Sequence, residues 1–332
     1  MRQWGNDLLI IGAGPAGLAA AIAAKQRGLT ARVVEKGALV NSLLHYPTDM
    51  VFFTTPELLE IGGLPFVSPY EKPTRQEALR YYRRVVEAFA LDVRLHEPVT
   101  ALVRQDDGSF LVTSRPAHGA PVAETARFVV LATGAYDVPN ALGVPGEDLP
   151  HVSHYYREPH RHYRQDVVIV GGKNSAAEAA LELYRAGARV LIVHRGAALG
   201  ESIKYWVKPD IENRIAEGAI RARFLTRIAE ITADAVVLDG PDGRVREKGD
   251  AVLLLTGYRS DTTLLRSVGA AIDAVEGAPV HNPETFETTV PNLFVIGAFV
   301  AGKQSGRIFI ENGRFHGEVA VREIKVRASR SI

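Results

Sequence analysis

The 332-residue chain is long enough for about two domains, and its 46% apolar and 23% charged residues are typical of a soluble globular protein. A net charge of +1 provides no bulk electrostatic attraction for nucleic acid or an anionic membrane, so neither is predicted as a partner. The chain has no cysteine, which excludes structural disulfides, thiolate metal sites and catalysis by a protein thiol.

An uncharged stretch runs from Leu8 to Ala24 near the N-terminus. We do not interpret it as a secretory signal, because glycines and a proline interrupt it and Asp7 stands where basic residues are needed. The stretch is also short for a membrane span. We therefore expect a buried strand over 7–11, a helix over 18–26 and a second strand over 31–34, in a cytoplasmic protein.

Between the first predicted strand and helix the chain reads Gly-Ala-Gly-Pro-Ala-Gly, which matches the G-x-G-x-x-G pattern. The glycines allow a tight turn and a close approach of the backbone to a pyrophosphate, which the helix N-terminus attracts. Glu35 ends the second strand, where a carboxylate accepts hydrogen bonds from a free ribose diol, as in the adenosine half of FAD. The residues predicted to bind this nucleotide are Gly12, Gly14, Pro15, Ala16, Gly17 and Glu35.

A loop over 151–164, HVSHYYREPHRHYR, combines four histidines with three arginines and three tyrosines. A metal site is one interpretation, but the spacing matches no ligand template well, and we predict no metal. A solvated basic loop is the second interpretation. The third is a basic, aromatic surface that docks the carboxylates of an electron acceptor. The loop itself does not separate these alternatives.

A second nucleotide module follows over 167–195, in the stretch VVIVGGKNSAAEAALELYRAGARVLIVHR. The first glycine and the end of the second strand are 23 positions apart in both modules (35 − 12 and 194 − 171). His194 and Arg195 here replace the carboxylate, and cationic side chains attract the 2′-phosphate of NADPH, which a carboxylate repels. Two such charge-assisted hydrogen bonds would favour NADPH over NADH by roughly 10²–10⁴.

Lys173 stands in this second module at the position of the second glycine of the first module. Its side chain either obstructs the pyrophosphate or points outward and helps to neutralise it. The residues predicted to bind NADPH are Gly171, Gly172, Lys173, Asn174, Ser175, His194 and Arg195. Two modules in one chain predict two dinucleotides, one of which is a flavin.

Three further stretches resemble those of a known protein family. Residues 129–134 read Val-Val-Leu-Ala-Thr-Gly, residues 144–147 read Val-Pro-Gly-Glu, and residues 288–317 read TTVPNLFVIGAFVAGKQSGRIFIENGRFHG. In these stretches the chain resembles the low-molecular-weight thioredoxin reductase class of FAD/NAD(P)H oxidoreductases. The stretches 45–66, 72–85, 202–215 and 310–317 resemble its bacillithiol-disulfide reductase-like branch.

This resemblance implies an α/β fold with two Rossmann-like, three-layer dinucleotide-binding domains, and a homodimer. The FAD domain would comprise 1–136 and 257–332, and the NADPH domain, 137–256, would be inserted into it. A helix beginning near Arg307 would direct its N-terminus at the flavin, and Arg314 and His316 lie too far along it to be assigned a role beyond contact with solvent or a second subunit. The resemblance adds these FAD contacts: Lys36, Asn41, His45, Thr133, Gly134, Gly297, Ala298 and Ile308. The sequence is equally compatible with a structural role for His45, in which its ring nitrogens are hydrogen-bonded within the protein.

The chain departs from that class in three places. It lacks the Cys-x-x-Cys pair before the second glycine turn, which excludes dithiol exchange with thioredoxin. Ala16 stands where bacillithiol-disulfide reductases typically have a cysteine. Ala298 replaces the aspartate that usually follows the glycine of the last flavin strand, so it offers only its backbone. No side chain is therefore predicted to act covalently.

The sequence thus predicts an NADPH-dependent FAD oxidoreductase that passes electrons to a second acceptor without a protein dithiol. A low-molecular-weight disulfide of the bacillithiol type ranks first as the acceptor, because of the specific resemblance. A ferredoxin- or flavodoxin-NADP reductase is the alternative, since dithiol-free members of this class perform that reaction. A flavin redox sensor without turnover is a third hypothesis, and the signature of Baeyer–Villiger monooxygenases is absent.

Overall fold

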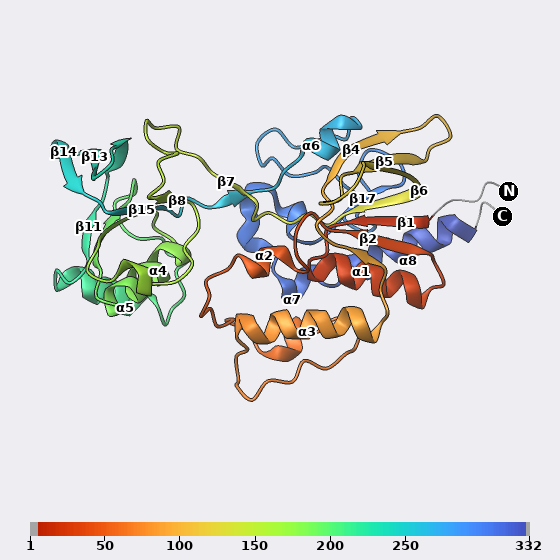
Figure 1. Cartoon of the computed structure of the whole chain (residues 1–332), viewed down its shortest axis with the longest axis horizontal. Coiled ribbons are helices and arrows are strands. Elements are labelled where there is room, and N and C mark those ends of the chain that lie inside the picture. The colour runs from red at the N-terminus through yellow and green to blue at the C-terminus, as the bar shows by residue number, and fades with distance from the viewer. Residues whose placement is uncertain (1–5, 330–332) are drawn as a thin grey trace. The chain divides into compact units, whose positions relative to one another are not determined.

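The chain folds into two compact units, which the computed structural model describes over residues 6–329 (Figure 1). Within these residues, unit 1 comprises 6–45, 49–138 and 258–329, and unit 2 comprises 46–48 and 139–257. Both ends of the described chain therefore belong to unit 1, and the middle of the chain forms a separate body. Where the chain passes between the units at residues 138–139 and 257–258, β7 (Val138–Pro139) pairs with β16 (Tyr258–Arg259).

Unit 1 is built on a seven-stranded sheet in the order β3-β2-β1-β6-β5-β4, with β17 also paired to β6. The pairings among β3, β2, β1, β6 and β17 are parallel, whereas β4, β5 and β6 are antiparallel. The central strands are apolar runs, because both faces of a parallel sheet are covered. The strands are β1 (Asn6–Ile11), β2 (Ala31–Val34), β3 (Val93–Arg94), β4 (Val99–Arg104), β5 (Phe110–Ser114), β6 (Val122–Leu131) and β17 (Leu293–Val295).

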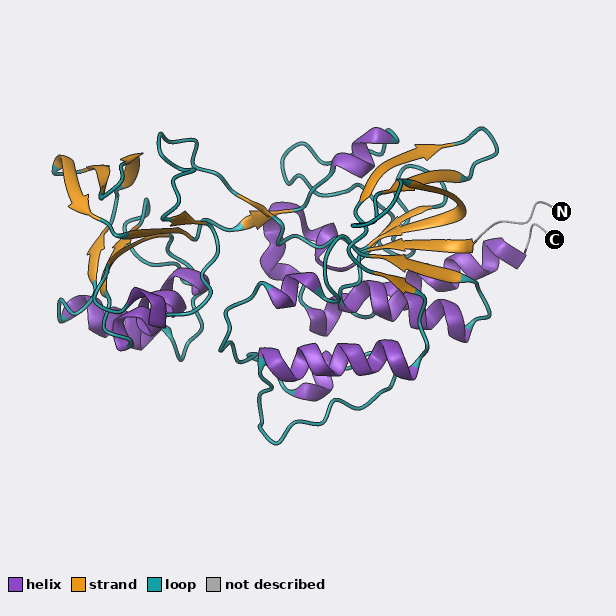
Figure 2. Ribbon diagram, viewed as in Figure 1, coloured by secondary structure: helices purple, strands orange, loops and turns teal. Residues whose placement is uncertain are grey.

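Helices cover this sheet, with α1 and α3 on one side of it and α6 against β4 on the other (Figure 2). Helix α3 begins with a complete capping box, in which Thr74 and Glu77 exchange side-chain and backbone hydrogen bonds. The helical segments of unit 1 are α1 (Pro15–Gln26), α2 (Asn41–Leu44), η1 (Pro56–Leu59), α3 (Arg75–Ala88), α6 (Thr263–Ser267), η3 (Gly297–Arg307), α7 (Ile310–Gly313) and α8 (His316–Ser329).

Two helix starts differ from the sequence prediction. Helix α1 begins at Pro15 instead of residue 18, because a proline at the first helical position has its φ preset for the helix. Near the C-terminus, Arg307 ends the 3₁₀ segment η3 instead of beginning a helix. Gly302, with a φ of 54°, interrupts η3, a single turn (α7) follows, and the long helix α8 begins only at His316.

Unit 2 has three layers. Its central sheet, β11-β10-β9-β15-β8, is entirely parallel. Val167 and Ile169 of β9 pack with the helix α4 on one face, and Val168 between them packs with the antiparallel sheet β12-β13-β14 on the other. The alternation follows the two-residue period of a strand.

The elements of unit 2 have the following bounds. The parallel strands are β8 (Val152–Ser153), β9 (Asp166–Val170), β10 (Arg189–Val193), β11 (Arg221–Arg223) and β15 (Ala251–Leu254). The antiparallel strands are β12 (Arg227–Ile231), β13 (Ala235–Gly240) and β14 (Gly243–Lys248). The helical segments are η2 (His160–His162), α4 (Asn174–Arg185) and α5 (Lys208–Ala216). Among the residues described in either unit, no helix has the length and apolar character needed to cross a bilayer.

Candidate functional site

The glycine turn of unit 1 joins β1 directly to α1. The N–H of Gly12 donates to the carbonyl of Val34 (2.8 Å), which brings the ends of the first two strands together. Gly12 has a φ of +110°, and a Cβ there would overlap the carbonyl oxygen of Ala132. A Cβ on Gly17 would overlap the carbonyl oxygen of Gly12. Only glycine fits this turn, and the free N–H groups of the first turn of α1 open next to it.

Glu35 lies buried at the end of β2 and holds this turn in place. Its Oε2 accepts the N–H of Ala13 (2.8 Å), and its Oε1 accepts the N–H of Gly37 (3.0 Å). A carboxylate offers about four acceptor positions, so both oxygens can still accept a ribose hydroxyl. The buried carboxylate is therefore positioned at the nucleotide turn and not merely at the end of a strand.

The loop after Glu35 packs against the same turn. The N–H of Val40 donates to the carbonyl of Ala13 (3.2 Å), and Lys36 forms an ion pair with Asp137 (2.8 Å). His45 ends the short helix α2, and its Nδ1 lies 2.8 Å from the carbonyl oxygen of Asn41. This contact gives His45 a partner four residues earlier in the chain. It fits the structural role, one of the two that the sequence left open.

Thr133 and Gly134 follow β6 on the neighbouring strand of the sheet. The Oγ1 atom of Thr133 is buried and has no hydrogen-bond partner within residues 6–329. Buried hydroxyls are almost always hydrogen-bonded, so this atom indicates a group that the protein atoms alone do not supply. Together with the open glycine turn and the carboxylate of Glu35, it shows that these residues fit a bound dinucleotide.

The last strand brings Gly297 to the first glycine turn. Gly297 has a φ of +68°, and a Cβ there would lie 2.8 Å from the Cβ of Ala16. Residues 281 positions apart in the chain (297 − 16) thus meet beside α1. Ala298 and Ile308 lie at the start of η3 and just after its end.

His316 and Arg314 do not have the roles predicted for them. His316 accepts the N–H of Gly297 with its Nδ1 (3.3 Å) and stacks on Phe286 (4.2 Å between ring centres). Burial, together with nearby His281, lowers the pKa of His316 to about 4. Arg314 donates to the backbone carbonyls of residues 57 and 60 (2.8 and 2.5 Å). Both side chains thus connect parts of unit 1 that are distant in the sequence.

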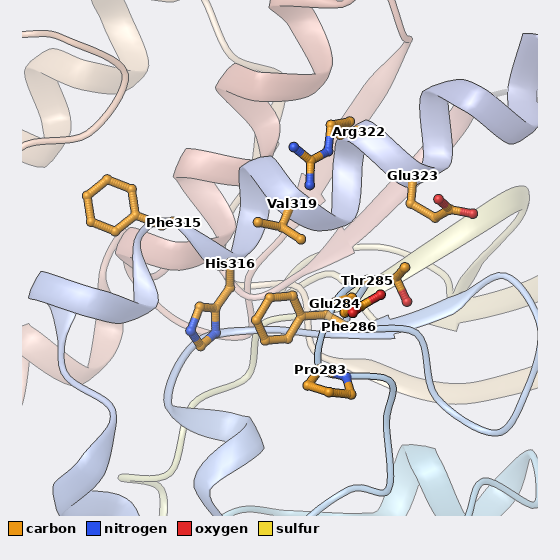
Figure 3. Close-up of a pocket in the computed structure, with 9 residues that line it drawn as sticks. All are labelled: Pro283, Glu284, Thr285, Phe286, Phe315, His316, Val319, Arg322 and Glu323. Carbon is orange, nitrogen blue, oxygen red and sulfur yellow. The ribbon is translucent and has the colours of Figure 1, made fainter.

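His316 and Phe286 also line a pocket of about 680 Å³ (Figure 3). The other residues that line it are Pro283, Glu284, Thr285, Phe315, Val319, Arg322 and Glu323. None of the predicted FAD contacts is among them, but His316 bonds to one of these contacts, Gly297.

The glycine turn of unit 2 has the same geometry at the start of α4. The N–H of Gly171 donates to the carbonyl of Val193 (3.1 Å), as Gly12 does in unit 1. Lys173 and Ser175 are both exposed at this turn. Asn174 is already engaged: its Nδ2 donates to the carbonyl of residue 202 (3.0 Å) and its Oδ1 accepts the N–H of residue 204 (2.9 Å).

His194 differs from the cationic contact that the sequence predicted. Its ring lies so close to Gly172 that a Cβ on this glycine would overlap the imidazole. Burial, and then the charge of Arg195, lower the pKa of His194 below its ordinary value of 6.5. The side chain is therefore uncharged at pH 7 before any ligand binds, and only exposed Arg195 has a permanent positive charge here.

The 151–164 loop is partly turned into unit 2. Tyr156 is buried and donates to Glu182 (2.7 Å), and buried His162 bonds to Gln165 (2.9 Å). Within residues 6–329 no group of three His, Asp or Glu side chains gathers at a distance that could hold a metal ion. The side chains that remain exposed are Arg157, His160, Arg161, Tyr163 and Arg164, so a smaller basic surface persists than the sequence suggested.

Comparison with known proteins identifies the family. Residues 9–297 match the pyridine nucleotide-disulphide oxidoreductases. The chain belongs to this family. It is 43% identical over 322 residues to Bacilliredoxin reductase Bdr of Bacillus subtilis, covering 95% of this chain and 98% of that protein. It is 26% identical to Ferredoxin–NADP reductase 1 of Bacillus licheniformis, covering 93% and 85%. Among solved structures it is similar to Bacillithiol Disulfide Reductase Bdr from Bacillus cereus, with a TM-score of 0.95, 40% identity and coverage of 97% and 99%.

These similarities confirm the predicted fold class and the resemblance on which it rested. The protein has the α/β fold of the thioredoxin reductase-like flavoproteins, with two Rossmann-like parallel sheets. It is an NADPH-dependent flavoprotein oxidoreductase, and its cofactors are FAD and NADPH. It differs from a thioredoxin reductase in having no cysteine at all.

Proposed function

We propose that this protein uses NADPH to reduce a low-molecular-weight disulfide of the bacillithiol type. The observation that carries the proposal is the similarity over almost the full length of both chains to a bacilliredoxin reductase and a bacillithiol disulfide reductase. The overall reaction consumes NADPH, one proton and one disulfide, and it yields NADP⁺ and two thiols. The two electrons of the hydride break the S–S bond.

We assign FAD to unit 1 and NADPH to unit 2, with domain limits at 1–136 and 257–332 for FAD and 137–256 for NADPH. The buried, unpartnered hydroxyl of Thr133 and the carboxylate of Glu35 support the FAD assignment. Exposed Arg195 supports the NADPH assignment. The residues proposed to contact FAD are Gly12, Gly14, Pro15, Ala16, Gly17, Glu35, Lys36, Asn41, His45, Thr133, Gly134, Gly297, Ala298 and Ile308. Those proposed for NADPH are Gly171, Gly172, Lys173, Asn174, Ser175, His194 and Arg195.

The absence of cysteine determines what the protein side chains can do. The bound flavin supplies the transfer of electrons from NADPH to the acceptor. The side chains bind and orient the cofactors: Glu35 holds the ribose, the N-terminus of α1 faces the pyrophosphate, and Thr133 donates or accepts one hydrogen bond. Because no protein thiol is available as a relay, the disulfide must reach the flavin itself.

Three further elements belong to this proposal. The protein acts in the cytoplasm, in line with the interpretation of its N-terminal apolar stretch as a buried strand and helix. It acts as a homodimer, as its resemblance to the thioredoxin reductase class implies. Small acidic carriers such as ferredoxin or flavodoxin are the alternative acceptors, supported by the more distant similarity to a ferredoxin–NADP reductase. A flavin redox sensor without turnover is the third candidate function, and an experiment must distinguish it from the two reductases.

An anaerobic titration followed by flavin absorbance tests the proposal. The FAD-loaded protein is first bleached with one equivalent of NADPH, and a parallel sample receives NADH. Bacillithiol disulfide is then added to the bleached protein, and free thiol is counted. We expect reoxidation of the flavin with release of two thiols per NADPH.

The same titration identifies the alternatives. Flavin that stays bleached with the disulfide but reoxidises with ferredoxin or flavodoxin would overturn the proposed acceptor in favour of a carrier reductase. Flavin that does not turn over even with ferricyanide would indicate a sensor. As a control, pretreatment with a thiol-alkylating reagent should leave the rate unchanged, because the chain has no cysteine to modify.

A further inference from the structure

Two large aromatic side chains stand exposed on unit 2. Tyr205 is 82% exposed and Trp206 is 45% exposed, and their rings pack edge to face with centres 4.8 Å apart. We call them the aromatic pair. Exposed aromatic side chains grouped on a folded surface mark binding sites, because water is a poor environment for them and their flat faces recognise other rings.

Buried neighbours fix the orientation of the aromatic pair. Ile203 precedes it and Val207 follows it, and both belong to the core of unit 2 beneath α4. The segment is thus anchored on both sides, and the two rings project outward because the fold places them there. A mobile loop that happened to contain aromatics would lack these anchors.

Three hydrogen bonds attach the same segment to the second glycine turn, one between backbone groups and two through the side chain of Asn174. The N–H of Gly200 donates to the carbonyl of Gly172 (2.7 Å). Asn174, the first residue of α4, donates to the carbonyl of Ser202 (3.0 Å) and accepts the N–H of Lys204 (2.9 Å). Tyr205 directly follows Lys204, so the aromatic pair begins one residue after a hydrogen bond to the start of α4, the helix proposed to face the dinucleotide.

The charges around the turn complete the chemistry of the surface. Lys173 and Arg195 are exposed, and within residues 6–329 neither has a carboxylate within ion-pair distance. Other lysines nearby are paired, as Lys204 is with Glu178 and Lys208 with a carboxylate of the 196–207 loop. One unpaired cation at the glycine turn and one just after β10, at the two places to which the segment of the aromatic pair is attached, suit a ligand that combines phosphate groups with a flat base.

We propose that Tyr205 and Trp206 form a stacking surface for the adenine of NADPH, continuous with the phosphate contacts at Lys173 and Arg195. The inference rests on the proposed NADPH site of unit 2. The segment 196–207 leaves the end of β10, next to the residues proposed for the 2′-phosphate, and the 2′-phosphate is on the adenosine half of the molecule. Stacking on the aromatic pair is thus a positioning interaction that a G-x-G-x-x-G pattern does not predict.

Binding of adenosine 2′,5′-bisphosphate to the FAD-loaded protein tests this inference without turnover. In a Trp4→Phe background, Trp206 is the one remaining tryptophan, so its emission reports ligand at the aromatic pair. We expect saturable quenching by the bisphosphate and none by nicotinamide mononucleotide. By calorimetry, Tyr205→Ala and Trp206→Ala should each raise the Kd of the bisphosphate by about 5- to 100-fold, as loss of base stacking does elsewhere.

Conservative and distant variants separate stacking from general damage. Tyr205→Phe and Trp206→Phe keep a flat ring and should change the Kd by less than about threefold. Tyr163→Ala, which removes another exposed aromatic (56%) from unit 2, should leave the Kd unchanged. Circular dichroism of each variant verifies that it folds.

Each other result overturns the inference in a distinguishable way. If the parent protein does not bind the bisphosphate, the NADPH site itself is misplaced and the proposed function fails with it. If the parent binds but the alanine variants bind equally well, the site stands and the stacking surface does not. Quenching by nicotinamide mononucleotide and not by the bisphosphate would assign the aromatic pair to the other base and refute the adenine assignment.

Discussion

Arg195→Ala is expected to lower the preference for NADPH over NADH by about 10- to 100-fold. A single charge-assisted hydrogen bond contributes about this factor in affinity. The sequence suggested two such bonds, but burial lowers the pKa of His194. His194 therefore adds only an uncharged contact at pH 7.5, and its replacement by Asn should cost less than about tenfold. The loss in Arg195→Ala should fall on the phosphorylated cofactor alone.

Calorimetry of the FAD-loaded protein with NADP⁺ and NAD⁺ at pH 7.5 measures both affinities without redox turnover. Arg227→Ala is a matched control, because it removes another exposed arginine from unit 2 on β12. It should leave both Kd values unchanged. Equal losses for NADP⁺ and NAD⁺ in Arg195→Ala would refute a 2′-phosphate contact.

The dependence on pH tests the assignment of charge to the two side chains. Protonation of His194 adds a second positive charge at this position, so the preference for NADP⁺ should rise as the pH falls below about 6.5. The 2′-phosphate also titrates, but it does so equally for the parent and for His194→Asn. A rise that is the same in both proteins would show that His194 does not contact the phosphate.

Three further predictions concern stability and the retention of FAD. Thr133→Val should stabilise the FAD-free protein by about 1 kcal/mol, since it removes a buried unpartnered hydroxyl, yet it should weaken FAD binding severalfold. Thermal unfolding and flavin fluorescence measure the two effects, and a less stable FAD-free variant would contradict the reasoning. Gly297→Ala should cost about 1–3 kcal/mol more than Gly134→Ala in the same unfolding assay. Both glycines have a φ near +70°, but only at Gly297 would a Cβ meet a neighbouring Cβ at 2.8 Å. Hydrogen bonding to Arg189 holds the pKa of Asp166 well below its ordinary value, so Asp166→Asn should lower the unfolding temperature at pH 7. The difference in unfolding temperature between the parent and Asp166→Asn should narrow as the pH falls below about 4, because the parent loses this stability when Asp166 is protonated. A difference that stays constant down to pH 2 would contradict the assigned role of Asp166.

Much of the fold could be predicted from the sequence, because its determinants are local. The glycines at 12 and 171 and the apolar runs before them indicated two strand–turn–helix units, and both turns are present with the same hydrogen bond to the second strand. The resemblance placed the last flavin strand in the same domain as the N-terminal module, and β17 pairs with β6 there. The signals are strong because close backbone approach admits no side chain at these glycines, whatever the rest of the chain does.

The amino-acid sequence by itself determined the family, the two nucleotide modules and the absence of any thiol chemistry. Only the tertiary structure decided the charge of His194, the inward orientation of His316 and Arg314, and the attachment of Tyr205 and Trp206 to the second glycine turn. The physical reason is the range of the interactions. Turn geometry depends on neighbouring residues, whereas burial, pKa and side-chain partners depend on atoms that come from distant parts of the chain.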